Sequence, residues 1–400
     1  MKIAIIVSAL VFSNNLFAQD LLNWQPLESD YTLASRLLNY DQQQTEGDYL
    51  SESTFRAYHN YQDLVLAWRL DNQIYQANDN HNLNTEWQFE LTELSWSHSF
   101  LESGEDLWQI GKFNLPLDPG YALQSVAFFE SSTDPFDDFA SNEGLTMINA
   151  SIWLQDYYLS TVISLEGQNS IYQDNSQWAL IMQRDFAALS SSVIVQQYQK
   201  SNLGIGSTFT YVSGDSWEFH GSTFIRKGSL WLTELSNNST LEDSFSERDN
   251  VWLPSVVLGS VWSGLENQFL MEWSYQKEKL SETEINTLQK ISAMAPAIEY
   301  NPQSANAFAY QKAIIDLYHQ RYQQQYLFVQ YQYQFLDHTI TANSLIGLDK
   351  SAVSQLKYEY LYGDSIAYWL TLDMTSGSEQ TEFRQIPWQN RLQVGLQWKI

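Results

Sequence analysis

The stretch that decides the fold is residues 391–400, with the sequence RLQVGLQWKI. Apolar side chains occupy every second position, and polar or small residues fill the positions between them. The apolar positions are Leu392, Val394, Leu396, Trp398 and Ile400. Successive side chains of a β-strand point to opposite faces, so this alternation predicts a strand with one apolar face. We expect this last strand to pair with the first one, because a membrane-embedded sheet tolerates no open edge.

The same alternation recurs along the chain in segments of roughly ten residues, the length that a tilted strand needs to cross a bilayer. The clearest are residues 63–70, 158–166, 268–275, 326–335 and 356–362. Residues 154–157, 213–216 and 363–364 are typical of hairpin turns between such segments. A soluble β-sandwich is the alternative, but soluble strands are usually shorter and carry fewer aromatic residues near their ends.

We therefore predict an all-β, antiparallel transmembrane β-barrel of about sixteen strands, within a range of about 14 to 18, starting near residue 51. The apolar faces of the strands would meet lipid, and the Gln, Glu, Lys and Ser faces would line a wet lumen.

Residues 1–18 have the pattern of a cleaved secretory signal peptide. Lys2 supplies the positive charge, residues 3–12 form the apolar run, and Ala18 precedes the expected cleavage site. An uncleaved membrane anchor is the alternative, but the apolar run is too short to span a bilayer comfortably. The predicted organisation is a signal peptide over 1–18 and a single barrel over 19–400, located in a bacterial outer membrane.

The composition excludes several classes of protein. The chain has 47 acidic residues against 20 Lys and Arg, so a nucleic acid is not an expected partner. Its 15 Trp, 24 Tyr and 20 Phe provide far more apolar surface than a disordered chain carries, and they suit girdles at two membrane interfaces. The absence of cysteine excludes disulfides and a lipid-modified cysteine.

Two long connections are of functional interest. Residues 114–144 carry four closely spaced acids, and residues 277–325 form a long loop with a helical insert, since Ser281 and Glu284 match a capping box. Inside the lumen the acids would form a constriction that favours cations, and outside it they would be a solvated surface that holds divalent ions. The four acids are Asp134, Asp137, Asp138 and Glu143.

Charged residues on the polar faces of the predicted strands are candidates for the lumen, where opposite charges across a pore would sort solutes. Ordinary cross-strand ion pairing is the alternative. The candidates are Arg69, Lys112, Arg226, Glu272, Lys357, Glu359 and Lys399.

No catalytic, cofactor-binding or metal-binding residues are predicted. The six histidines lack the spacing of a metal site, and no Gly-x-Ser-x-Gly motif occurs. Ser97 and His98 are adjacent, but neighbours on a strand point to opposite faces.

Three short motifs carry a resemblance to a known group of proteins. They are Leu94 to His98 (LSWSH), Trp108 to Lys112 (WQIGK) and Leu117 to Tyr121 (LDPGY), followed by the acidic loop and another strand. Together they resemble porin-like outer-membrane proteins of Gram-negative bacteria, in the neighbourhood of the alginate-export-like barrels. Many such barrels end in Phe or Trp, whereas this chain ends in Ile400 with Trp398 on the same face.

The resemblance implies a passive channel or export barrel. The first interpretation is a porin-like channel for hydrophilic solutes or an exported polymer, in contact with outer-membrane lipids and lipopolysaccharide, with homo-oligomers allowed. The second is a plugged barrel within a polymer-export or surface-assembly system. An outer-membrane hydrolase is a third and weaker interpretation.

Overall fold

The computed structural model describes residues 28–42, 45–61, 63–76, 83–101, 104–126, 136, 144–165, 177–198, 202–227, 251–277, 323–378, 381–385 and 388–399. Eighteen antiparallel strands form one sheet in which each strand pairs with its neighbours in the chain. The strands are β1 (Glu28–Gln42), β2 (Thr45–Tyr61), β3 (Leu64–Gln76), β4 (Leu83–His98), β5 (Asp106–Phe113), β6 (Leu145–Leu154), β7 (Tyr157–Ser164), β8 (Gln177–Phe186), β9 (Leu189–Tyr198), β10 (Asn202–Ser213), β11 (Trp217–Lys227), β12 (Trp252–Ser263), β13 (Asn267–Gln276), β14 (Gln325–Phe335), β15 (His338–Gly347), β16 (Ala352–Tyr362), β17 (Ile366–Ser376) and β18 (Trp388–Lys399).

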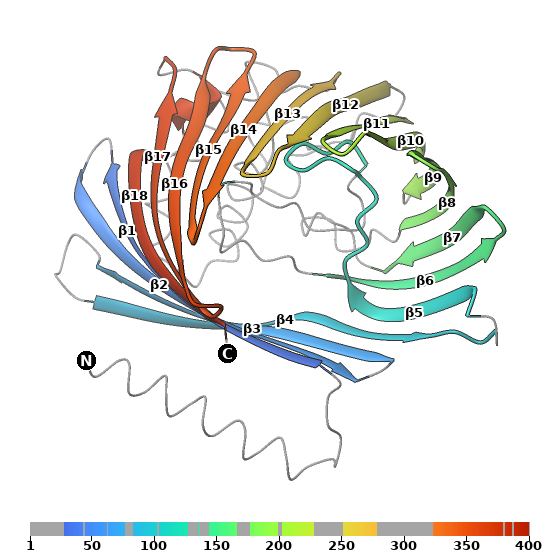
Figure 1. Cartoon of the computed structure of the whole chain (residues 1–400), viewed down its shortest axis with the longest axis horizontal. Coiled ribbons are helices and arrows are strands. Elements are labelled where there is room, and N and C mark those ends of the chain that lie inside the picture. Colours follow the sequence, from blue (N-terminus) through green and yellow to red (C-terminus); the bar gives the residue numbers. More distant parts are fainter. Residues whose placement is uncertain are drawn as a thin grey trace, which may run out of the picture.

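The last strand closes the sheet on the first. β18 pairs with β1 in an antiparallel ladder that includes Thr32 opposite Lys399 and Arg36 opposite Gly395. Figure 1 shows these two strands side by side at the seam of the barrel. The predicted barrel is thus confirmed, and the strand count lies at the upper end of the predicted range.

The longest connections lie at one end of the barrel, and short connections occur at both ends. Each even-numbered strand from β2 to β16 reaches the next strand through a short turn, including the three predicted hairpin turns. Gln155, Gly214 and Gly363 adopt positive φ angles of 58°, 63° and 61° in these turns. The longest connections follow odd-numbered strands, after β5 and after β13.

Alternation of side chains gives the barrel an apolar outer face and a more polar inner face. On β13, Met271 and Trp273 are exposed on the outside, whereas Leu270 and Glu272 are buried on the inside. A lipid-facing barrel requires this arrangement, because large apolar side chains are stable where they meet hydrocarbon. The predicted segments 268–275, 326–335 and 356–362 lie within strands, whereas 63–70 begins one residue before β3 and 158–166 extends past the end of β7.

The strands extend beyond the segments that the pattern marks. The first begins at Glu28 rather than near residue 51, and β3 and β4 extend into the polar residues 71–76 and 83–86. Polar side chains at alternate positions there, such as Asp71 and Gln73, face the lumen, so no apolar run reveals the strand.

Some predictions fall on residues that are not described. The signal peptide over 1–18 and most of the partly helical loop over 277–325 lie outside the described residues. Within the described part of the chain, the only helix is the short 3-10 helix η3 (Glu382–Gln385). No helix there is long and apolar enough to cross a membrane.

A candidate constriction inside the barrel

The chain turns into the barrel after β5. Residues 114–126 run from β5 across the interior toward β11, β12 and β13 (Figure 1). We call these residues, together with Phe136 from the same connection, the inserted segment. Its position is defined by two buried carboxylates and by two groups of apolar side chains.

Glu272 on β13 is the first carboxylate, and its side chain is fully buried on the lumen face. It accepts hydrogen bonds from the backbone N–H groups of Tyr121, Ala122 and Leu123 at 2.6, 2.8 and 2.9 Å. His220 Nε2 lies 2.8 Å from the same carboxylate. A carboxylate offers about four acceptor sites, so these four contacts satisfy it, and each is a strong charge-assisted bond.

Asp118 is the second carboxylate, and it belongs to the segment itself. It accepts hydrogen bonds from the backbone N–H groups of Gly120, Ser125 and Val126, at 2.6 to 2.9 Å. Ser222 on β11 donates its hydroxyl to Asp118 at 2.7 Å and lies 2.7 Å from the hydroxyl of Ser125, which donates to it. Asp118 therefore both folds the segment and joins it to the barrel wall.

His220 fits between the segment and the wall because β12 has a glycine beside it. A Cβ atom on Gly259 would lie 2.1 Å from His220 Nε2, so any larger residue would displace the imidazole. The Tyr121 ring lies 5.3 Å from the imidazole, and its hydroxyl donates to Glu218 at 3.3 Å. Partial burial and the Glu218 carboxylate raise the pKa of the Tyr121 phenol, which keeps it protonated as a donor.

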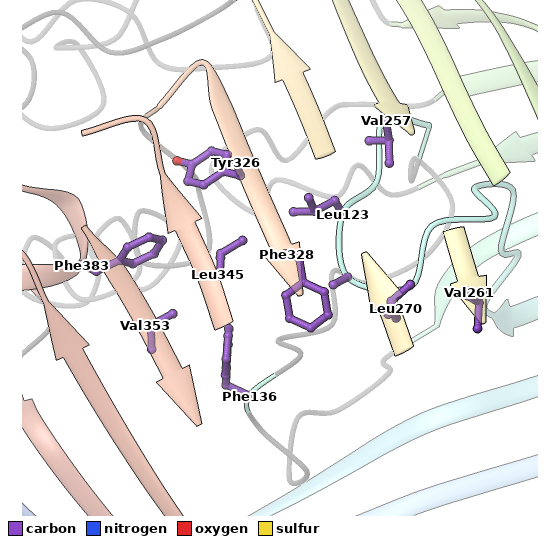
Figure 2. Close-up of a cluster of buried hydrophobic side chains, with 11 residues drawn as sticks. Leu123, Phe136, Val257, Val261, Leu270, Tyr326, Phe328, Leu345, Val353 and Phe383 are labelled. Atoms are coloured by element: carbon purple, nitrogen blue, oxygen red, sulfur yellow. The ribbon is translucent and has the colours of Figure 1, made fainter. Parts of the chain in front are cut away.

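Apolar side chains fill the space between the segment and the wall. Figure 2 shows Leu123 and Phe136 of the segment among side chains from β12 to β16. The Phe136 ring meets Phe328 on β14 edge-on at 6.2 Å, and Gln355 on β16 donates to the Phe136 carbonyl at 3.0 Å. A second cluster forms around Val126, with members from β5 to β11: Phe113, Met147, Val162, Ala179, Ile181, Ile194 and Phe224.

The strands on the other side of the barrel have a different inner face. On β17, β18 and β1 to β4, the lumen face carries ion pairs, with Arg36 2.5 Å from Glu52, Arg69 2.6 Å from Asp71, and Arg391 2.8 Å from Asp373. Gln393 bridges two of these pairs, since it accepts from Arg36 and donates to Asp373. Pairs of opposite charge therefore stabilise this wall, two of them between neighbouring strands and one, Arg69 with Asp71, within β3.

The structure distributes the predicted lumen charges over both sides. Glu272 holds the inserted segment, Arg69 pairs with Asp71, and Lys357 lies 3.2 Å from Glu359. Arg226 shares the lumen face of β11 with Ser222. The strand register instead places Lys112 on the face of β5 that carries the exposed Ile110, opposite Leu94 of β4. Lys399 is opposite Thr32 at the seam.

The predicted acidic constriction is not described, because Asp134, Asp137, Asp138 and Glu143 lie outside the described residues. The sequence analysis missed Asp118, His220 and Ser222 as residues that hold the segment. The LDPGY motif that contains Asp118 was visible, but nothing local marks a contact across about a hundred residues of chain. Among the described residues, no group of three or more His, Cys, Asp or Glu could hold a metal ion.

A closed antiparallel barrel with an apolar outer face and polar positions on its inner face is the architecture of transmembrane β-barrels of the outer-membrane type. Solved structures that resemble this chain include Gram-negative outer-membrane porins of the Occ/OprD family. OccAB1 of Acinetobacter baumannii is 8% identical, with a TM-score of 0.55 over 93% of this chain and 96% of that one. OccK7 (OpdD) of Pseudomonas aeruginosa is 10% identical, with a TM-score of 0.53 over 93% and 99%.

OccK3 (OpdO) of Pseudomonas aeruginosa is similar as well, at 8% identity and a TM-score of 0.52 over 96% of this chain and 99% of that one. At these identities the likeness concerns the fold. No protein-family model matches the chain, and no curated protein matches it in sequence.

Proposed function

We propose that this protein is a porin-like channel of the bacterial outer membrane, through which small hydrophilic solutes pass passively. It acts without catalytic residues or a cofactor. The inserted segment would narrow the lumen, and the large exposed side chains of the outer face, such as Met271 and Trp273, would contact membrane lipid.

One observation carries the proposal. The inserted segment is bound at three successive backbone N–H groups by the fully buried carboxylate of Glu272, in the middle of a lumen-facing strand wall. A segment that merely covered a mouth of the barrel would not need such an anchor. A fixed internal constriction does, because its position sets the size of the solutes that pass.

The proposal extends to the acids of residues 114–144, for which the sequence allowed either a lumen constriction or a solvated surface, and it takes the first alternative. Asp134, Asp137 and Asp138 would add negative charge to the narrow region and favour cations. Contacts with lipopolysaccharide and the formation of homo-oligomers are further parts of the proposal, which vesicle binding and mass measurements in detergent would test separately.

Single-channel recording of the refolded protein in a planar bilayer tests the function. We expect stepwise conductance with a preference for cations, and a weaker preference in a variant with Asp134, Asp137 and Asp138 all replaced by Asn. A folded, inserted barrel that passes no current would overturn the channel proposal. That result would favour the alternative of a plugged barrel in a polymer-export or surface-assembly system, the role that the alginate-export-like resemblance allows.

A further inference from the structure

We infer that solutes follow only one side of the lumen, along the inner faces of β17, β18 and β1 to β4, and that charged residues there set the selectivity. We call this side the charged half and the inner faces of β5 to β16 the covered half. The inference rests on the proposed channel function and goes beyond it by placing the path and its selective residues.

The distribution of buried apolar side chains is the first argument. Among the described residues, those that are buried inside the barrel belong to the inserted segment, to the covered half or to η3, with Trp369 on β17 as the exception. Apolar side chains at a lumen face are stable only where something excludes water from them. The inserted segment does so for the covered half, since Val126 packs on β6 to β9 and Leu123 on β12 to β14.

The distribution of charge is the second argument. The six strands of the charged half place charged side chains at many lumen-facing positions, whereas the twelve strands of the covered half carry few. In the charged half they are Glu28, Asp30, Arg36, Glu52, Arg56, Arg69, Asp71, Glu90, Glu93, Asp373, Arg391 and Lys399. In the covered half they are Asp185, Glu218, Arg226, Glu272, Lys357 and Glu359.

Water contact is the third argument. The side chains of Glu52, Arg69 and Asp71 retain 13 to 15% of their exposure although each is ion-paired, whereas Glu272 and His220, which contact the inserted segment, retain none. Asp373 in the charged half is also fully buried. The partly exposed charges of the covered half include Glu218 on β11 and the pair Lys357 and Glu359 on β16, the strand next to the charged half. Burying a charge without a partner is costly, so an ionic wall of this density needs water beside it. An aqueous path along the charged half supplies that water, and the field of the wall then acts on passing ions.

Glu93 connects this path to the constriction. It lies on the lumen face of β4 opposite Ala67, and the neighbouring Thr92 carbonyl accepts from the N–H of Gly144, where the connection from β5 returns to the wall. Its carboxylate accepts a hydrogen bond from Ser95 at 3.1 Å. Glu93 therefore lies on the path beside the point where the connection from β5 rejoins the barrel wall.

Introduced cysteines give the most direct test, because the natural chain has none. Ala67 on β3 and Ala179 on β8 both face the lumen, and both are opposite a polar residue on the next strand, but Ala179 is fully buried under the segment and Ala67 is not. During single-channel recording, we expect a cationic methanethiosulfonate reagent to cause a stepwise loss of current through Ala67→Cys. It should leave Ala179→Cys unchanged.

The ion selectivity gives an independent test, because removing a negative charge and removing a positive charge should shift the reversal potential in opposite directions. Asp71→Asn and Glu93→Gln each remove a negative charge from the path, so the reversal potential in a salt gradient should shift toward anions. Arg69→Gln should shift it toward cations. Asp156→Asn, in the exposed turn between β6 and β7, is the control without a shift.

Two results would overturn the inference. One is a current block through Ala179→Cys with none through Ala67→Cys. The other is an ion selectivity that stays at the wild-type value in all three variants, Asp71→Asn, Glu93→Gln and Arg69→Gln. A wild-type protein that carries no current would instead contradict the proposed function, so the two failures are distinguishable.

Discussion

The covered half and the charged half are built on the same strand pattern but are stabilised in different ways. In the covered half, the inner face packs on the inserted segment through apolar side chains and two carboxylates that bind backbone N–H groups. In the charged half, the inner face is held by ion pairs, two between neighbouring strands and one within β3. The covered half holds the inserted segment in place, and the charged half provides a charged wall along the lumen.

This difference separates two kinds of variant. Changes that loosen the covered half should free the inserted segment while the barrel stays closed, so the width of the channel changes. Changes in the charged half should leave the segment in place and alter the stability of the seam or the ion selectivity.

The largest effect is expected for Glu272→Ala. It removes the acceptor of three backbone N–H groups and the partner of His220, and loss of a buried charged partner costs about 3–5 kcal/mol. Because the lost contacts hold the inserted segment and not the barrel wall, the segment should become mobile, and the unitary conductance should rise and fluctuate. Chymotrypsin should then cleave after Tyr121 in the folded barrel.

Glu266→Ala is the matched control, because Glu266 is an exposed carboxylate in the turn before β13. It should conduct and resist chymotrypsin like the wild type. If Glu272→Ala did the same, the inserted segment would not depend on this anchor, and the two halves would not differ as described.

A smaller effect, in the other half, is expected for Arg36→Met. Arg36 on β1 joins Glu52 on β2 to Gln393 on β18, so it crosses the closing seam. Hydrogen bonds to charged groups contribute about 1.5–3 kcal/mol each. The midpoint of urea unfolding should fall, while the unitary conductance of the folded protein should keep its wild-type steadiness. Arg184→Met, on the exposed outer face of β8, should leave the midpoint unchanged.

Ser222→Ala should weaken the attachment of the inserted segment to the covered half less than Glu272→Ala does. The variant loses one hydrogen bond to the Asp118 carboxylate and one from Ser125, with a net cost of about 2 kcal/mol. The temperature at which chymotrypsin begins to cut the inserted segment should fall slightly below the wild-type value. Ser274→Ala, on the lumen face of β13, is the control. An equal decrease in the cleavage temperature of this variant would show that the hydrogen bond to Asp118 is not what holds the segment.

The sequence predicted the barrel because its outer face imposes one rule on every strand. Lipid selects apolar side chains at alternate positions, so segments such as 268–275 and 326–335 could be read without a structure. The first strand was not predicted, because Ser35 lies among its outward-facing positions and the alternation of apolar and polar side chains is therefore weak. The division of the lumen into two halves was not predicted for another reason. Ala179, Ile181 and Ile194 face inward, but in the sequence they cannot be distinguished from apolar residues that face lipid.

The candidate site could be predicted only in part. Glu272 stood out as a charge on a polar strand face, which the alternation locates. Its partners lie about 150 residues earlier, in a segment without regular structure, and no local pattern records a pairing at that distance. The same holds for Asp118 and Ser222, which come together only because the barrel brings β11 near the segment that follows β5.

The smallest effect is expected for Asp156→Asn, and it defines the scale for the others. Asp156 lies in the turn between β6 and β7, its side chain is 70% exposed, and it is 3.8 Å from Arg184. Exposed pairs of this kind contribute between about 0 and 1 kcal/mol, because water already stabilises both charges and salt screens them. Urea unfolding and ion selectivity should both match the wild type. A shift as large as that of Arg36→Met would mean that net charge, rather than pairing at the seam, stabilises the charged half.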